Sequence, residues 1–159
     1  MVDIVDKTTR SRMMACICAK DTRPEVVIRK KLYSRGFRYR KNVKSLPGTP
    51  DIVLKKYDAV IQIHGCFWHG HDCDDFKWPA TRPVFWKNKI LNNQKRDRLS
   101  AQRLLGAGWK LLIVWECAVK KATKGKDDNN LQELVDTISS WIMSDEKGIK
   151  HIGGSKLAK

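Results

Sequence analysis

The sequence predicts an α/β domain in which a central mixed β-sheet is flanked by helices. Three amphipathic stretches repeat their apolar residues at helical spacing, at 22–36, 83–105 and 131–142. Short runs rich in β-branched and aliphatic residues alternate with them, at 52–54, 60–63 and 110–115. Helices and strands in this order favour a layered architecture with helices on the faces of one sheet.

The first helix is predicted from its start and stop signals. Thr22 and Glu25 have the spacing of a capping box, and Pro24 suits the first helical turn. Gly36 can end the helix because glycine adopts the left-handed conformation common just after a helix.

A hairpin is predicted next. Residues 37–41 alternate apolar and basic side chains like a strand, and 46–50 have the composition of a turn. The runs at 52–54 and 60–63 are close enough in sequence to pair with each other as neighbouring strands.

The long helix at 83–105 has an inward stripe with an unexpected acid. Its members recur at spacings of four, three, four and three: Ile90, Gln94, Asp97, Ala101 and Leu104. Asp97 occupies a position that otherwise calls for an apolar side chain. A strand at 110–115 follows, and we expect 120–130 to be a linker before the last helix.

The chain is strongly basic. It has 32 Lys and Arg against 17 Asp and Glu, a net charge of +15 and a sequence pI near 9.8. Such an excess is typical of proteins that bind nucleic acid. We therefore interpret 1–21 as a DNA-contacting arm, 22–145 as a single domain, and the Gly- and Lys-rich residues 146–159 as a disordered tail.

No segment suggests a membrane protein. No apolar run approaches the roughly 20 residues that span a bilayer, and the N-terminus has no hydrophobic stretch like a secretory signal. We expect an intracellular, cytoplasmic protein with no membrane partner. In that reducing compartment the five cysteines should be unpaired, which leaves metal binding or simple burial.

Metal-binding residue types crowd into 64–73. Cys66, His71 and Cys73 have the spacing C-x4-H-x-C, and Cys117 follows the strand at 110–115 as a candidate fourth ligand. Three thiolates and one imidazole would hold Zn²⁺ tetrahedrally and leave no position for water, so this zinc would be structural. The alternative is that the cysteines are merely buried and the histidines exposed.

A second metal site, with a hard oxygen ligand, is predicted at Asp51. The hairpin brings Asp51 near His64, at the ends of neighbouring strands. A carboxylate beside an imidazole suits Mg²⁺-assisted phosphodiester hydrolysis. The alternative is that Asp51 only shapes its loop.

Taken together, these residues resemble the very short patch repair endonuclease family. The resemblance runs in order from about Asp6 to Trp141 and rests on Pro50-Asp51, His64-Gly65-Cys66-Phe67-Trp68-His69, Pro79-Ala80-Thr81-Arg82, Phe85-Trp86, Arg96-Asp97-Arg98, Gly108-Trp109 and Val114-Trp115-Glu116-Cys117. It implies a monomer with a restriction-endonuclease-like fold and a structural zinc. The implied activity is a Mg²⁺-dependent nick 5′ to the thymine of a T·G mismatch, the lesion left when 5-methylcytosine deaminates, before downstream repair proteins act.

The resemblance also implies roles for individual residues. Asp51 and the backbone carbonyl of Ile63 would bind magnesium, and His69 would be the general base. Asp97 would orient the His69 imidazole, which is reasonable because a carboxylate at one ring nitrogen fixes the tautomer. His64 would lie near the scissile phosphate.

Two of these assignments carry a complication. Glu25 would be a further active-site acid by resemblance, although its capping-box spacing offers a structural role instead. The chain also departs from the family's usual pattern at Ile63, where a hydroxyl residue is common, and at Gly70, where another histidine often follows His69.

Aromatic residues near the predicted ligands suggest how a mismatch is read. Phe67, Trp68 and Trp86 could act as wedges that unstack a base step, which costs less at a T·G wobble than at a matched pair. Their alternative role is in the core. By resemblance, Met14 lies at the opposite groove, and Lys89 and Asn93 make polar contacts with the mismatch.

Two other functions are compatible with the sequence. One is a restriction-type endonuclease that cuts both strands, although a small chain without an obvious dimerisation helix favours nicking one strand. The other is a zinc-dependent DNA-binding protein without catalysis, which would have no need for Asp51, His69 and Asp97.

Overall fold

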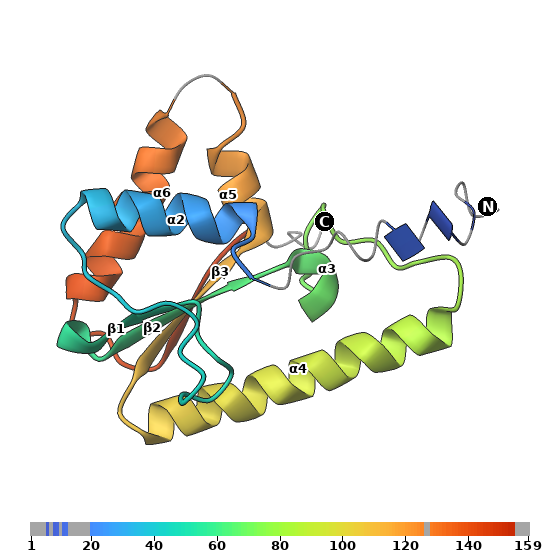
Figure 1. The fold of residues 1–159 in the computed structure, drawn as a ribbon, viewed down its shortest axis with the longest axis horizontal. Coiled ribbons are helices and arrows are strands. Elements are labelled where there is room, and N and C mark those ends of the chain that lie inside the picture. The colour runs from blue at the N-terminus through green and yellow to red at the C-terminus, as the bar shows by residue number, and fades with distance from the viewer. Residues whose placement is uncertain (1–5, 7, 10, 13–19, 126–127, 155–159) are drawn as a thin grey trace.

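A computed structural model describes residues 6, 8–9, 11–12, 20–125 and 128–154 (Figure 1). Its elements in chain order are α2 (Arg23–Ser34), β1 (Ile52–Leu54), the short 3-10 helix η1 (Lys55–Tyr57), β2 (Ala59–His64), α3 (Cys66–His69), α4 (Pro83–Gly106), β3 (Lys110–Trp115), α5 (Glu116–Ala122), α6 (Asn129–Met143) and β4 (Ile149–Ile152). Among the helices described, none is both long and apolar enough to cross a membrane.

The strands form one mixed sheet in the order β1-β2-β3-β4. β1 pairs antiparallel with β2, with Ile52 opposite Ile61. β2 and β3 are parallel, and β4 adds to β3 in parallel as well. The prediction of a mixed sheet flanked by helices is therefore confirmed, and the expected hairpin is the β1–β2 pair.

Each face of the sheet is covered by a different set of helices (Figure 1). Ile61 and Leu112 belong to the larger core, which includes residues of α2, α5 and α6. Val60 and Leu111, one position earlier on each strand, pack with Leu104 of α4 on the other face. Successive strand residues point to opposite faces, so two neighbouring strands supply both cores.

The long helix α4 serves two parts of the molecule. Ala101 and Leu104 near its C-terminus pack on the sheet, whereas Ile90 packs against Cys66 and Cys73. Its N-terminal half runs past the sheet alongside α3 (Figure 1). The predicted 83–105 helix and its inward stripe thus connect the core to the Cys- and His-rich segment.

Three local expectations were wrong. Residues 37–41 form no strand but only an isolated bridge between Arg40 and Val53. Part of the expected linker at 120–130 is the end of α5, which buries Val119 and Ala122 beneath the lysines that suggested a linker. The expected disordered tail contains β4, whose side chains alternate between exposed and half-buried positions. Backbone pairing with β3 makes it a strand despite its weakly apolar composition.

Lys110, at the start of β3, is 3% exposed, and its ammonium group lies at the C-terminus of α6. The Nζ atom donates to the carbonyl oxygens of Trp141, Ile142 and Ser144 at 2.9, 3.0 and 2.5 Å. The last carbonyls of a helix have no partner within the helix, so a buried cation there satisfies them and opposes the negative end of the helix dipole.

We expect Lys110→Met to lower the free energy of unfolding by about 2–3 kcal/mol, because three buried carbonyl groups lose a charged donor. Urea denaturation followed by circular dichroism measures this loss. Lys121→Met, at an exposed lysine of α5, is the matched control and should change stability little. Equal stability of the two variants would contradict the role given to Lys110.

Candidate active site and metal centre

An open pocket of about 970 Å³ lies where α2 begins, β1 begins and β2 ends. Because β1 and β2 are antiparallel, Asp51 before β1 and His64 at the end of β2 reach the same edge of the sheet. The acidic and imidazole side chains that line the pocket are Glu25, Asp51, His64, His69, Asp97 and Glu116. All five residues that we predicted to be catalytic are therefore brought together.

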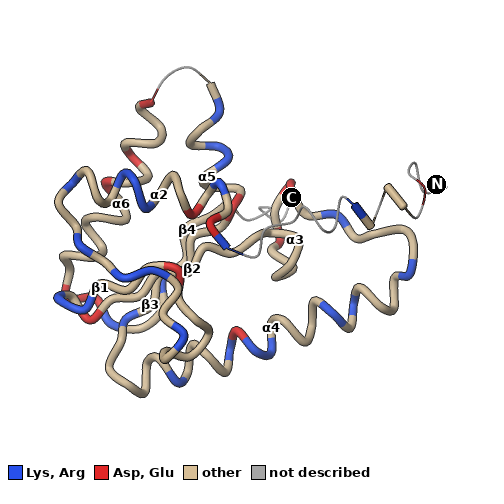
Figure 2. Tube along the Cα trace, viewed as in Figure 1, with Lys and Arg blue, Asp and Glu red and all other residues tan. Residues whose placement is uncertain are grey.

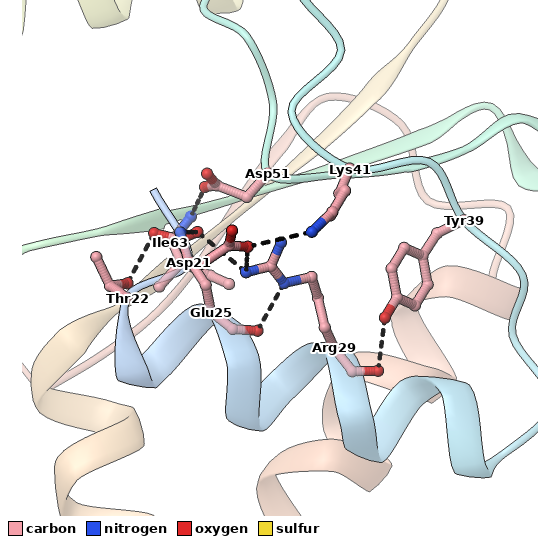
Figure 3. A network of polar contacts seen from close by, with 8 residues as sticks. All are labelled: Asp21, Thr22, Glu25, Arg29, Tyr39, Lys41, Asp51 and Ile63. Atoms are coloured by element: carbon pink, nitrogen blue, oxygen red, sulfur yellow. Dashed lines mark hydrogen bonds and ion pairs between the residues drawn. The ribbon is translucent and has the colours of Figure 1, made fainter. Parts of the chain in front are cut away.

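Asp51 is held by the backbone of β2. Its Oδ2 accepts a hydrogen bond from the Ile63 N–H at 2.7 Å (Figure 3). The N–H and C=O of one strand residue face the same side, so the Ile63 carbonyl also faces the side of Asp51, beyond the end of β1. Burial raises the pKa of Asp51 to about 6, and the nearby Glu25 carboxylate adds to this rise. A half-buried carboxylate beside a backbone carbonyl has the oxygen ligands that Mg²⁺ prefers.

His69 and Asp97 form a closely spaced pair. His69 Nδ1 lies 2.5 Å from Asp97 Oδ2, and both side chains are about a quarter exposed. The carboxylate favours the tautomer with a proton on Nδ1, which leaves Nε2 free to accept one. The acid on the inward stripe of α4 thus contacts the imidazole on α3 that it was predicted to orient.

His64 lies directly beneath His69. The two rings stack with centroids 3.8 Å apart and an interplanar angle of 10°. Burial and the neighbouring His69 lower the pKa of His64 to about 3, so its imidazole is neutral at pH 7. Ligand atoms of His64, His69 and Asp97 also lie within 4.8 Å of one another, which makes this trio a second place that could hold a metal ion.

Glu25 contributes to both the pocket and the start of α2. The side chain is 5% exposed, and its carboxylate accepts the Thr22 hydroxyl at 2.7 Å and the Asp21 N–H at 3.0 Å (Figure 3). Arg29 Nη2 lies 3.4 Å from the same carboxylate. The predicted capping box differs in detail, because the Thr22 side chain makes no cap bond and Glu25 reaches Asp21 instead. Its structural and active-site roles are therefore compatible.

The four predicted zinc ligands converge on one point. One ligand atom from each of Cys66, His71, Cys73 and Cys117 lies within 4.8 Å of all the others. His71 Nδ1 is 3.6 Å from the sulfur atoms of both Cys66 and Cys117. A tetrahedral ion with bonds of 2.0–2.3 Å separates its ligands by about 3.5–3.8 Å, so the residues fit such an ion.

The surroundings of these thiols favour a bound ion over free thiolates. Burial raises the pKa of both Cys66 and Cys117, so without an ion both keep their protons at neutral pH. A metal ion can replace the protons, because ligation and thiol deprotonation are coupled.

A tryptophan that we had not assigned to the metal centre supports it. Trp115 stacks on the His71 ring with centroids 4.0 Å apart and an interplanar angle of 5°. The segment after β4 packs on the same tryptophan: a Cβ at Gly153 would lie 2.6 Å from Trp115 Cδ1. The signal in the sequence was the position of Trp115, two residues before a candidate ligand at the end of a buried strand.

The short helix α3 is fastened to α4 by side-chain amides. Asn93 Nδ2 donates to the Trp68 carbonyl at 2.8 Å, and Gln94 Nε2 donates to the His69 carbonyl at 3.0 Å. Gly70 follows α3 with a φ of +61°, and a Cβ there would lie 2.6 Å from Ile90 Cγ2. Close packing on α4 and the positive φ therefore favour glycine at this position.

The candidate DNA-contacting residues have different environments. Phe67, Trp68 and Trp86 form a half-buried cluster with ring centroids 5.1–6.1 Å apart. Lys89 is exposed, whereas Asn93 is 8% exposed and bonded to α3, so a contact between Asn93 and DNA requires it to exchange that partner. Met14 lies outside the described residues.

Comparison with known proteins gives a consistent result. A family model described as DNA mismatch endonuclease Vsr matches residues 2–75. The DNA mismatch endonuclease Vsr of Escherichia coli K12 is 44% identical over 142 residues, which cover 89% of this chain and 88% of that protein. The type II nicking enzyme V.NmeAIP of Neisseria meningitidis is 43% identical over 140 residues, covering 87% of this chain and 100% of that protein.

The raised pKa of Asp51 predicts a stability cost in the metal-free protein. Its pKa of about 6 in the folded state exceeds its ordinary value of 3.8, so ionisation opposes folding, and this carboxyl lowers stability as the pH rises from about 4 to 6. In chelator at pH 7, we expect Asp51→Asn to be more stable than the wild type by about 1–3 kcal/mol. The advantage should shrink toward pH 4.

Chemical denaturation at several pH values measures this difference. Asp74→Asn, at an exposed aspartate, is the control and should show no such dependence on pH. If Asp51→Asn were less stable than the wild type at pH 7, the carboxylate would be stabilising and our reading of its environment would be wrong.

Proposed function

The chain belongs to the Vsr family of DNA mismatch endonucleases, and on this basis we propose that it nicks one strand of double-stranded DNA 5′ to the thymine of a T·G mismatch. Hydrolysis would depend on Mg²⁺ and would begin very short patch repair of deaminated 5-methylcytosine. The observation that carries this proposal is the convergence of Asp51, His69 and Asp97 in one open pocket. We also propose an intracellular, cytoplasmic location in which the protein meets DNA.

The pocket supplies distinct groups for hydrolysis. Asp51 and the Ile63 carbonyl are the oxygen ligands that would hold magnesium, which when bound would polarise the phosphate and lower the pKa of the attacking water. His69 would accept the water proton at Nε2. Asp97 would keep Nδ1 protonated and stabilise the imidazolium that forms.

Two further residues shape this chemistry. His64 is neutral and stacked on His69, so it would position the base and donate a hydrogen bond rather than supply a positive charge to the phosphate. Glu25, buried at the side of Asp51, would add negative charge that favours a divalent cation in the pocket.

Recognition of the mismatch would use α4 and the aromatic cluster. Lys and Arg are distributed along α4, and Asp97 is its one acidic residue (Figure 2). Phosphate contacts by such residues orient a protein on DNA without reading its sequence. Phe67, Trp68 and Trp86 would enter the base stack where the T·G wobble weakens it. Met14 and Lys89 would contact the mismatch from either groove, and Asn93 would do so after releasing Trp68.

We further propose that Cys66, His71, Cys73 and Cys117 bind a structural zinc ion and that the enzyme acts as a monomer. Four protein ligands leave no coordination site for water or substrate, so this ion would shape α3 rather than take part in hydrolysis. One group of candidate catalytic residues, gathered in one pocket of the described part of the chain, suits the cutting of one strand. Other repair proteins would then process the nick.

Cleavage of labelled duplexes tests the proposed activity. We expect the wild type with Mg²⁺ to nick only the thymine strand of a T·G duplex, leaving T·A and C·G duplexes intact, and to be inactive in chelator. Cutting of both strands of a matched duplex would instead indicate a restriction-type enzyme. Binding without any cleavage would indicate a non-catalytic zinc protein.

Asp51→Ala extends the same experiment to the pocket. Loss of a metal ligand should reduce the single-turnover rate by about 10³-fold or more while largely sparing DNA affinity, because binding rests on phosphate and base contacts elsewhere. Asp74→Ala, an exposed loop change, is the matched control. Wild-type turnover by Asp51→Ala would overturn the catalytic assignment.

Metal analysis tests the zinc proposal. We expect one zinc per purified chain, and Cys117→Ser should weaken zinc binding by more than the roughly 10–100-fold that loss of an outer-shell partner costs. Cys18→Ser changes the same residue type outside the four-ligand group and should retain zinc. Equal zinc affinity of the two variants would remove Cys117 from the site.

A further inference from the structure

Two lysines border the active-site pocket without a role in the proposed chemistry. Lys20 and Lys44 are both exposed, and both line the pocket. Within residues 20–125 and 128–154, neither takes part in any of the ion pairs formed. Lys41, between them in sequence, differs because it lies 3.5 Å from Asp21. The pocket border therefore has two ammonium groups available to a ligand.

The segments that bear these lysines are anchored through Arg29 of α2 (Figure 3). The buried Arg29 side chain donates to Asp21 Oδ1 at 2.6 Å, directly after Lys20. The Arg29 carbonyl accepts the Tyr39 hydroxyl at 3.0 Å, so one residue of α2 contacts both segments. The Lys41–Asp21 pair also joins them, but an exposed pair of this kind contributes little energy.

The backbone on each side adds to this anchoring. Arg40 exchanges two backbone hydrogen bonds with Val53 of β1, at 2.9 and 2.8 Å, which fixes the chain leading to Lys44. Asp21 and Asn42 both have left-handed backbones, with φ of +54° and +50°. Such conformations persist in residues other than glycine when their surroundings hold them, and they are enriched at functional sites.

The negative charge inside the pocket suggests a role for the two lysines. Its interior contains the carboxylates of Glu25, Asp51, Asp97 and Glu116, which repel a phosphodiester backbone. Positive groups at the border would offset this repulsion and guide the strand to the reacting groups. The DNA strand carries phosphates on both sides of the scissile bond, and these are the anionic groups that the two lysines could bind.

We propose that Lys20 and Lys44 bind phosphates of the cut strand that flank the scissile phosphate, and that Asp21 is a positioning residue that holds Lys20 at the pocket border through its bond to Arg29. This inference rests on the proposed endonuclease function. It identifies a strand-binding subsite of that same pocket, formed by residues on two segments that α2 brings together.

Salt-dependent binding to a T·G duplex tests the subsite, with Mg²⁺ omitted so that no cleavage occurs and the proposed zinc stays bound. Each phosphate contact contributes about 0.9 to the slope of log K against log [salt]. Lys20→Ala and Lys44→Ala should each lower the slope by about one and weaken binding roughly 3–10-fold at moderate salt. Lys30→Ala removes the same charge from an exposed position of α2 away from the pocket and should leave the slope nearly unchanged.

Uncharged methylphosphonates placed one at a time around the nick position locate each contact. At the phosphate that Lys44 binds, Lys44→Ala should cause no further loss of affinity, whereas at other positions its effect should persist. Slopes for Lys20→Ala and Lys44→Ala equal to that for Lys30→Ala would overturn the proposal. So would a Lys44→Ala effect that persists at every methylphosphonate position.

The role of Asp21 has its own readout. In an Asp21→Asn background, Lys20→Ala should lower the salt slope by clearly less than one, because Lys20 is no longer held in place. An undiminished effect would remove Asp21 from the proposal. These measurements need only DNA binding. A wild type that binds the duplex but does not nick it would refute the proposed function, while the phosphate contacts of Lys20 and Lys44 would still be decided by the salt slopes.

Discussion

A helix of four residues cannot hold its shape in water, because the nucleation of a helix costs more than a single turn returns. The element that carries residues of both candidate sites, α3, is such a helix. Cys66 at its start joins the metal-binding group, and the carbonyls of Trp68 and His69 at its end accept bonds from α4. The position of the His69 imidazole therefore depends on a cysteine cluster at one end and on two amides at the other.

The active site concentrates groups that are unfavourable to bury. Asp51 is ionised in a site that raises its pKa to about 6, and His64 is kept neutral beneath a second imidazole. A divalent cation among the carboxylates would offset the cost of ionising Asp51. The parallel β2–β3 pairing continues up to His64 and so helps to hold the His64 imidazole in place. The rigid sheet thus supports a pocket that would be unstable on a loop.

Periodicity was enough to predict the elements that cross the core. The inward stripe of α4 and the β3 run at 110–115 carry strong patterns, and the structure places both as expected. Asp97 was recognisable as a candidate site residue because it broke such a stripe. By contrast, the buried side chains of α5 lie among lysines, and the residues of β4 are only exposed or half-buried, so both elements carry weak patterns.

Contacts between segments were harder to predict than the segments themselves. The cysteine and histidine spacing suggested the metal ligands, yet nothing local showed that Trp115 would stack on His71 or that Arg29 would contact Asp21. The candidate metal centre is also completed late, since Cys117 and the Gly153 packing on Trp115 follow the candidate ligands at 66–73. During synthesis on the ribosome, the emerging polypeptide therefore exposes an incomplete thiol cluster until Cys117 has been translated.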